Sequence, residues 1–191
     1  MKKLVIALGV SVLLGACAGG MGSSNATGSM AANPMVGGAP MYANKDIVDN
    51  AVNSKDHTTL VAAVKAAGLV DTLKSPGPFT VFAPTNAAFA ALPPGKVDTL
   101  LKPENKGTLT TVLTYHVVPG RMDAAALMSA INAGGGKAML KTASGGTLTA
   151  TMSGGKVMVT DAKGGMATVT IANVYQSNGV IHVVDKVLLP G

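Results

Sequence analysis

The segment Phe79–Leu92, FTVFAPTNAAFAAL, places the strongest constraint on how this chain folds. It opens with a short run of apolar, β-prone residues, which is typical of a buried strand. Pro84 ends this run, and Thr85 is then placed to cap a short helix whose apolar face includes Phe89. The segment therefore predicts a unit that builds the core. It contains no nucleophile with a base, no metal-ligand cluster and no phosphate-binding loop.

Apolar residues at helical spacing predict further helices on both sides of this unit. Gly68 and Gly134 are placed to end two of them, because glycine readily adopts the left-handed conformation of a helix C-terminus. The expected helical segments cover residues 46–52, 58–67, 69–73, 97–101, 103–115 and 123–133.

The last third of the chain changes to short alternating segments rich in Thr, Val and Met. Pairs of glycines separate them, and such pairs indicate hairpins because tight turns need positive φ. Helices that precede an antiparallel sheet predict the α+β class. The expected strands cover residues 137–142, 147–152, 156–160, 167–172, 174–175 and 180–189.

Residues 1–16 combine a basic start, an apolar run from Leu4 to Leu14 and small residues before Cys17. This pattern predicts a secretory signal peptide that is too short for a typical spanning helix. The ending LGAC resembles a bacterial lipobox, in which the cysteine is lipidated and becomes the new N-terminus. An ordinary signal peptide with an incidental cysteine is the alternative. Cys17 is the only cysteine, so no intrachain disulfide is possible.

Residues 17–43 are expected to hold the lipidated cysteine and a flexible tether. Ala18–Tyr42 is rich in Gly, Ser, Ala, Asn and Met and carries no charge. Thioethers favour Cu(I), but no histidine accompanies the methionines of this segment, so a plain linker is the preferred interpretation. The folded domain is then expected over residues 44–191. The tether methionines are Met21, Met30, Met35 and Met41.

The charge of the chain is mildly positive and scattered. Removal of Lys2 and Lys3 with the signal lowers Lys plus Arg from 15 to 13 against 9 acidic residues, which changes the net charge from +6 to +4. Arg121 is the only arginine, and the chain has no tryptophan. Binding to nucleic acid is therefore not expected, because phosphate grooves favour clustered arginines and stacking aromatics.

The sequence offers no pattern for catalysis, for a metal or for a cofactor. His57, His116 and His182 are far apart and lack the spacing of zinc ligands. No G-x-S-x-G motif is present, and Glu104 is the only glutamate available for a glycosidase pair. The glycine pairs lack the Lys-Ser/Thr of a P-loop. We therefore expect no enzyme activity, no metal site and no cofactor.

His116 invites two interpretations, because it stands where a predicted helix passes into an extended run. One interpretation is a buried histidine that supports the fold through hydrogen bonds. The other is an interaction surface formed by His116 and its neighbours. The candidate motif for either role comprises Leu113, Tyr115, His116, Val117 and Val118.

Three segments together resemble the fasciclin (FAS1) domain family. They are FTVFAPTNAAFAALP at 79–93, LTYHVVPG at 113–120 and NGVIHVVDKVLLP at 178–190, which match in order the first box, the Tyr-His motif and the second box of the family. The resemblance covers about residues 43–190. It implies a fasciclin-like β-wedge of two small, mainly antiparallel sheets, with N-terminal and intervening helices packed along it.

The resemblance implies extracellular adhesion or matrix interaction rather than catalysis. Some animal members bind integrins through an Asp-Ile pair just upstream of the second box. The corresponding positions here are Asn173 and Val174, so the carboxylate is absent. The string NKDI at 44–47 is similar to such a peptide but lies at the other end of the domain, and it is interpreted as chance.

The expected protein is thus a membrane-anchored adhesion or envelope-interaction module with one fasciclin domain, similar to small bacterial surface lipoproteins. A periplasmic lipoprotein that binds a small ligand or senses redox stress is the alternative. Lipid on Cys17 would attach the chain to a membrane. Ala18 after the cysteine favours the outer membrane, facing the periplasm or the surface, and secretion is the other expected location. The expected partners are the membrane and a protein or polysaccharide of the envelope or of a host surface.

Overall fold

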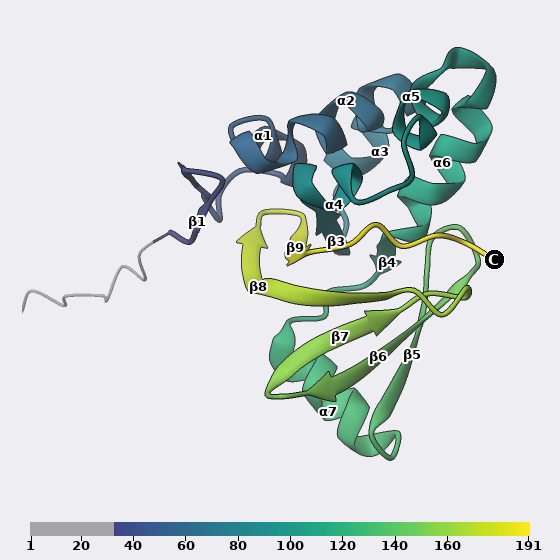
Figure 1. The fold of residues 1–191 in the computed structure, drawn as a ribbon. Helices are drawn as coiled ribbons and strands as arrows, with labels where there is room; N and C mark the ends of the chain where they lie inside the picture. Colours follow the sequence, from purple (N-terminus) through teal and green to yellow (C-terminus); the bar gives the residue numbers. More distant parts are fainter. Residues whose placement is uncertain (1–32) are drawn as a thin grey trace, which may run out of the picture. The chain divides into compact units, whose positions relative to one another are not determined.

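The computed structural model describes residues 33–191 (Figure 1). The predicted signal peptide over residues 1–16 and the predicted lipid attachment at Cys17 lie outside the described residues.

The expected helices are confirmed, and polar side chains cap three of them. Asp46, Thr85 and Asp123 each accept a hydrogen bond from a backbone N–H in the first turn that follows, as their residue types predict. Gly68 ends α2 with φ of 73°. The helix expected over 103–115 is divided into a 3-10 turn, Pro103–Asn105, and α6. The helices are α1 (Ile47–Ala51), α2 (Thr58–Ala67), α3 (Val70–Lys74), α4 (Asn86–Ala90), α5 (Lys96–Leu101), α6 (Lys106–Tyr115) and α7 (Ala124–Ala133).

Seven strands form one hydrogen-bonded ladder in the order β4-β3-β9-β8-β7-β6-β5. Every pair is antiparallel except β3 with β9, which run parallel. The run expected to continue to residue 189 stops as a strand at Val184, and the two runs expected around residue 173 are one long strand, β8. The strands are β3 (Phe79–Pro84), β4 (Val117–Pro119), β5 (Lys137–Lys141), β6 (Thr147–Ser153), β7 (Lys156–Thr160), β8 (Met166–Gln176) and β9 (Gly179–Val184).

Strand β8 joins the two halves of this ladder. Its first residues pair with β7, and its remainder pairs with β9 across two register shifts. Such irregularities bend and twist a strand, and Asn173 takes a positive φ of 59° there. The sheet halves therefore form the wedge that the resemblance to the fasciclin family implies, with α1–α6 on one side and α7 under β5–β7 (Figure 1).

Each half of the wedge has its own hydrophobic core. The first core lies between the helices α1–α6 and the pair β3–β9, and it includes Leu60, Val81 and Ile181. The second core lies between α7 and the strands β5–β8, and it includes Leu127 and Leu148. Alternate residues of β5, β6 and β7 point into this second core, as the two-residue period of a strand requires.

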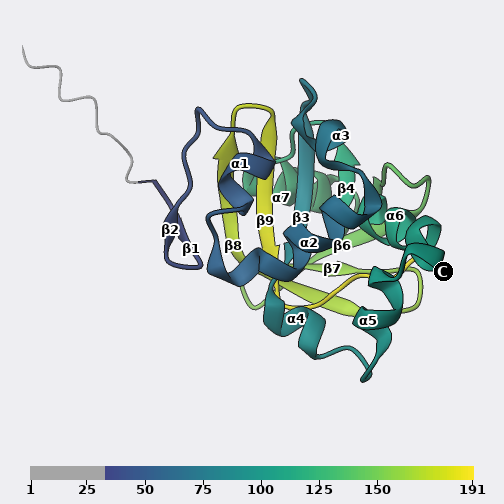
Figure 2. The same ribbon diagram turned by 90° about the horizontal axis from the view of Figure 1, so that it is seen from above.

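The expected start of the domain at residue 44 is wrong, because the segment just before it is folded. Strands β1 (Met35–Val36) and β2 (Ala39–Pro40) form an antiparallel hairpin beside α1 (Figure 2). Val36 and Met41 are only 3% and 2% exposed and belong to the first core. The backbone N–H of Lys55 donates to the carbonyl of Gly37 at 3.2 Å. Part of the expected tether is thus folded, because two apolar residues around a Gly-Gly turn are buried in the first core.

This hairpin generates a prediction for truncated chains. A chain that begins at Asn33 is expected to match the full chain in stability, whereas one that begins at Asn44 loses the burial of Val36 and Met41. That loss is expected to cost about 2–4 kcal/mol of unfolding free energy. Urea denaturation followed by circular dichroism measures the difference. Equal midpoints for the two truncated chains would contradict the assignment of the hairpin to the folded domain.

Candidate functional site

The Tyr-His motif lies at the point where α6 passes into β4. Tyr115 is the last residue of α6, His116 is its C-cap, and Val117 begins β4. Leu113 and Val118 flank them, and all five side chains are at most 7% exposed. An interaction surface made of these side chains is therefore incompatible with the structure, because a partner would find none of them at the surface. Their burial fits the fold-supporting interpretation.

His116 makes two hydrogen bonds that fix its tautomer. Its Nε2 lies 2.9 Å from the backbone nitrogen of Leu188, an N–H donor, so Nε2 accepts. Its Nδ1 lies 2.7 Å from the carbonyl oxygen of Val112, so Nδ1 carries the proton and donates. Burial lowers the pKa of His116 to about 4, because the charged form would lose its hydration. The ring is thus a neutral connector between α6 and the C-terminal segment.

Tyr115 connects the end of α6 to the second core through the hydrogen bonds of its hydroxyl. Its hydroxyl donates to the carbonyl of Thr147 at 2.8 Å and accepts from the backbone N–H of Ala162 at 3.0 Å. Gly146 lets the ring come close, since a Cβ there would lie 2.5 Å from a ring carbon. Burial raises the pKa of Tyr115. The neighbouring Asp161 accepts the backbone N–H of Leu189 at 2.9 Å and so holds the same C-terminal segment as His116.

The other two histidines are also buried, and they do not meet His116 in a metal site. Nδ1 of His57 is hydrogen-bonded to the hydroxyl of Ser54 at 2.9 Å, and Nε2 of His182 donates to the carbonyl of Met122 at 2.8 Å. Burial lowers the pKa of both rings. Over residues 33–191, no group of three or more His, Cys, Asp or Glu side chains is arranged to hold a metal ion.

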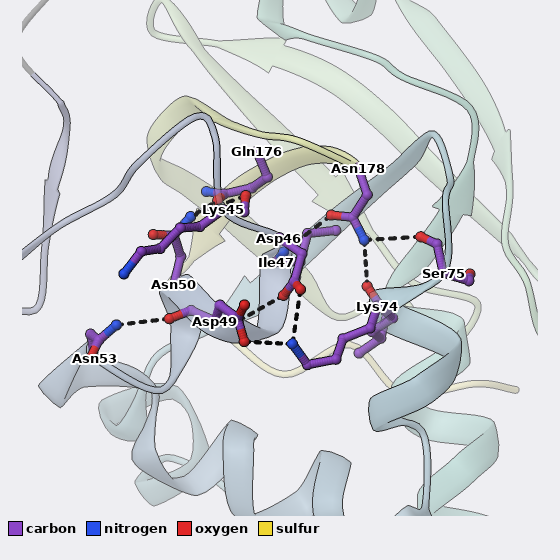
Figure 3. Close-up of polar contacts among 11 residues, drawn as sticks. Lys45, Asp46, Ile47, Asp49, Asn50, Asn53, Lys74, Ser75, Gln176 and Asn178 are labelled. Atoms are coloured by element: carbon purple, nitrogen blue, oxygen red, sulfur yellow. Dashed lines mark hydrogen bonds and ion pairs between the residues drawn. The ribbon is translucent and has the colours of Figure 1, made fainter.

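A polar cluster joins α1 and α3 to the turn between β8 and β9 (Figure 3). Asn178, in that turn, accepts the backbone N–H of Ile47 at 3.1 Å and donates to the carbonyls of Leu73 at 2.6 Å and Ser75 at 3.1 Å. Asn50, on α1, is completely buried and donates to the side-chain oxygen of Gln176. Asn178 bonds to residues more than 100 positions away, and Asn50 bonds to Gln176, so the cluster fastens the start of the domain to its end.

The NKDI string at residues 44–47 lies in this cluster, which sequence reasoning did not predict. The N–H of Ser177 donates to the carbonyl of Lys45 at 2.9 Å, so the string runs beside the β8–β9 turn. Asp46 caps α1 and forms an ion pair with Lys74 at 2.9 Å, and Asp49 pairs with the same lysine at 2.5 Å. The acidic side chain of the string is thus engaged by α1 and by Lys74 of the same domain. No pattern in the sequence signals a contact between residues this far apart.

The positions that correspond to the Asp-Ile pair of animal members are structural here. The side-chain oxygen of Asn173 accepts the backbone N–H of Ala124 at 2.7 Å, at the first turn of α7, and Val174 is completely buried. The exposed neighbour is Tyr175, which is 39% exposed. The guanidinium carbon of Arg121 lies 5.4 Å from the centre of its ring, and its hydroxyl lies 3.3 Å from a carboxylate oxygen of Asp123.

The fold and these three motif segments define a class of protein, a small α+β module in which the motif residues build the interior. The profile of the fasciclin domain matches residues 55–190. The chain belongs to the fasciclin family.

Several curated proteins are similar to this chain. Protein sll1483 of Synechocystis is 54% identical over 145 residues, which cover 75% of this chain and 73% of that protein. Immunogenic protein MPB70 of Mycobacterium bovis is 36% identical over 190 residues, which cover 96% of this chain and 90% of that protein.

One solved structure shares the fold. The FAS1 domain pair from the insect cell adhesion molecule fasciclin I matches with a TM-score of 0.68 at 17% identity, over 76% of this chain and 51% of that chain. The fasciclin domain is common in extracellular and adhesion proteins, and its family is one of non-catalytic modules. Among residues 33–191, no helix is both long enough and apolar enough to cross a membrane.

The buried His116 generates a prediction for the pH dependence of stability. Below pH 6.5 the unfolded chain binds a proton at this ring, whereas the folded chain does not until about pH 4. The contribution of His116 to stability is therefore complete above pH 6.5 and is lost as the pH falls toward 4. At pH 5 the loss is expected to reach about 2 kcal/mol of unfolding free energy.

The variant His116→Asn isolates this effect, because it keeps His57 and His182. It is expected to be less stable than the parent at pH 7.5, and the difference is expected to narrow by about 2 kcal/mol at pH 5. Urea titrations at the two pH values measure both differences. An unchanged difference between parent and variant would show that His116 does not titrate in this way.

Proposed function

We propose that this chain is a lipid-anchored, non-catalytic module of a bacterial cell envelope that binds an envelope or host-surface component. The observation that carries the proposal is membership of the fasciclin family across nearly the whole folded domain. The lipobox-like ending LGAC at Cys17 supports the anchor. Ala18 after the cysteine supports the outer membrane as its location.

The contact surface of the module is the patch formed by the exposed Arg121 and Tyr175 and the half-buried Asp123. Tyrosine and arginine are the side chains that most often carry the binding energy of an interface. A tyrosine presents a large, rigid surface at low entropic cost, and the guanidinium stacked on it adds a cation for an acidic group of the partner. The Arg121 side chain also lies 3.5 Å from the carbonyl of Gln176, which restrains it. The patch is therefore arranged before a partner arrives.

The lipid anchor generates a prediction for Cys17. In a Gram-negative host, the full chain is expected to fractionate with membranes and to incorporate a labelled fatty acid. Cys17→Ser removes the thiol that carries the lipid, and this variant is expected to lose the label and to leave the membrane fraction. Equal labelling of the parent and of the Cys17→Ser variant would rule out the anchor. Loss of label without loss of membrane association would place the attachment elsewhere in the chain.

The contact surface generates a second prediction. The double variant Arg121→Ala/Tyr175→Ala is expected to lower binding of the chain to isolated cell envelopes by about tenfold, in keeping with a hot-spot pair. Its melting temperature is expected to change little, since both side chains are exposed. Envelope pull-down at increasing protein concentration measures the affinity.

A matched control is available in the same chain. Tyr42 is also 39% exposed, and the ammonium of Lys45 lies 5.2 Å from the centre of its ring. The variant Tyr42→Ala/Lys45→Ala removes a tyrosine and its cation from a different segment and is expected to leave binding unchanged. If the two double variants weaken binding equally, the assignment of the contact to Arg121 and Tyr175 is wrong.

A further inference from the structure

An apolar cavity of about 90 Å³ lies in the first core, between the helices α1, α2 and α3 and the strands β3 and β9. Figure 2 shows these helices over the two strands. Protein interiors rarely leave voids larger than a water molecule. A water needs roughly 10–15 Å³ of such volume and two to four polar partners. This cavity is large enough for several waters, but its apolar wall offers them few hydrogen-bond partners. An apolar cavity of this kind stays dry and accepts apolar molecules.

Part of the cavity wall runs along α2. The wall includes His57, Leu60, Val61, Val64 and Lys65, which follow one face of α2 and the turn before it. From His57 to Lys65 the helix rises about 12 Å at 1.5 Å per residue. A volume of about 90 Å³ beside a wall of this length suits one unbranched hydrocarbon chain.

The end of the α2 wall at His57 is buried and uncharged. Val36 and Met41 from the N-terminal hairpin cover it, and both are buried. The ring of His57 stands at this end with its Nε2 near the carbonyl of Ala83, without a hydrogen bond of normal geometry. Burial lowers the pKa of His57, which keeps the ring neutral. This end therefore suits the methyl end of an aliphatic chain.

The other end reaches exposed side chains. Lys65 and Thr72 are exposed, and Val61 and Val70 are half-buried. Lys65 is the one charged side chain in the cavity wall, and the ion pairs of the described residues all belong to Lys74. The ammonium of Lys65 is thus available at the mouth, where it suits an anionic group attached to the chain that enters.

We propose that this cavity binds a single-chain aliphatic carboxylate, with its hydrocarbon tail along α2 and its carboxylate at Lys65. This ligand site is separate from the exposed patch around Tyr175. None of Arg121, Asp123 and Tyr175 belongs to the cavity wall. Either proposal can therefore fail without the other.

Decanoate and decan-1-ol are the probes, because they share a tail and differ in charge. Isothermal titration with the full chain is expected to show one site for decanoate. Lys65→Gln is expected to weaken decanoate about threefold, as befits one exposed ion pair, and to leave decan-1-ol unchanged. Lys55→Gln is the matched control, because it makes the same charge change on a residue outside the cavity wall and is expected to alter neither affinity.

Filling the cavity tests the location of the tail. Ala51 is a half-buried residue of the wall, and Ala51→Leu is expected to weaken both probes at least tenfold while it raises the melting temperature of the free protein. Val61→Phe, at a second half-buried position of the wall, serves if Ala51→Leu fails to fold. The absence of decanoate binding at millimolar concentration would overturn the proposal. Binding that survives both filling variants would overturn it as well.

Discussion

The structure depends on one neutral imidazole at the junction of its two cores. The ring of His116 joins α6, through the carbonyl of Val112, to the segment after β9, through the N–H of Leu188. A neutral imidazole can donate to the carbonyl of Val112 and accept from the N–H of Leu188 at the same time. A cationic side chain in its place would have no acceptor for the N–H of Leu188. The backbone carbonyl of His116 also accepts the N–H of Phe82 at 2.9 Å. A single residue thereby couples α6, strand β3 and the segment after β9.

The two other motif segments serve the same assembly. Phe79 on β3 lies opposite Gly179 on β9 in the parallel pair. A Cβ at position 179 would lie 2.2 Å from the carbonyl oxygen of Phe79, so the close approach needs glycine there. Asn178 beside it satisfies backbone groups of Ile47 in α1, of Leu73 in α3 and of Ser75 just after α3. The segments by which the family is recognised are thus adjacent in space, and each contributes side chains to the interior.

The sequence predicted the helices and most strands because their signals are local. Thr85, Asp123 and Gly68 act through neighbours three or four residues away, and each does in the structure what its type predicts. The sequence did not predict the hairpin of residues 35–40, because its burial depends on contacts with α1 and with the turn at Ser54. Nor did it separate the two interpretations of His116, since helical spacing gives the direction of a side chain but not what covers it.

The residues that identify the family are buried, so they are not the residues that contact a partner. Side chains such as Tyr115 and Phe82 are nearly inaccessible, so chains that share these segments share a scaffold and not a binding specificity. Specificity then has to come from residues outside the motifs, such as Arg121 and Tyr175 on the surface. The same holds for the cavity, where Lys65 on α2 supplies the only charge of the wall. The two proposed sites can change independently, because substitutions at exposed or half-buried positions leave the hydrogen bonds of His116 intact.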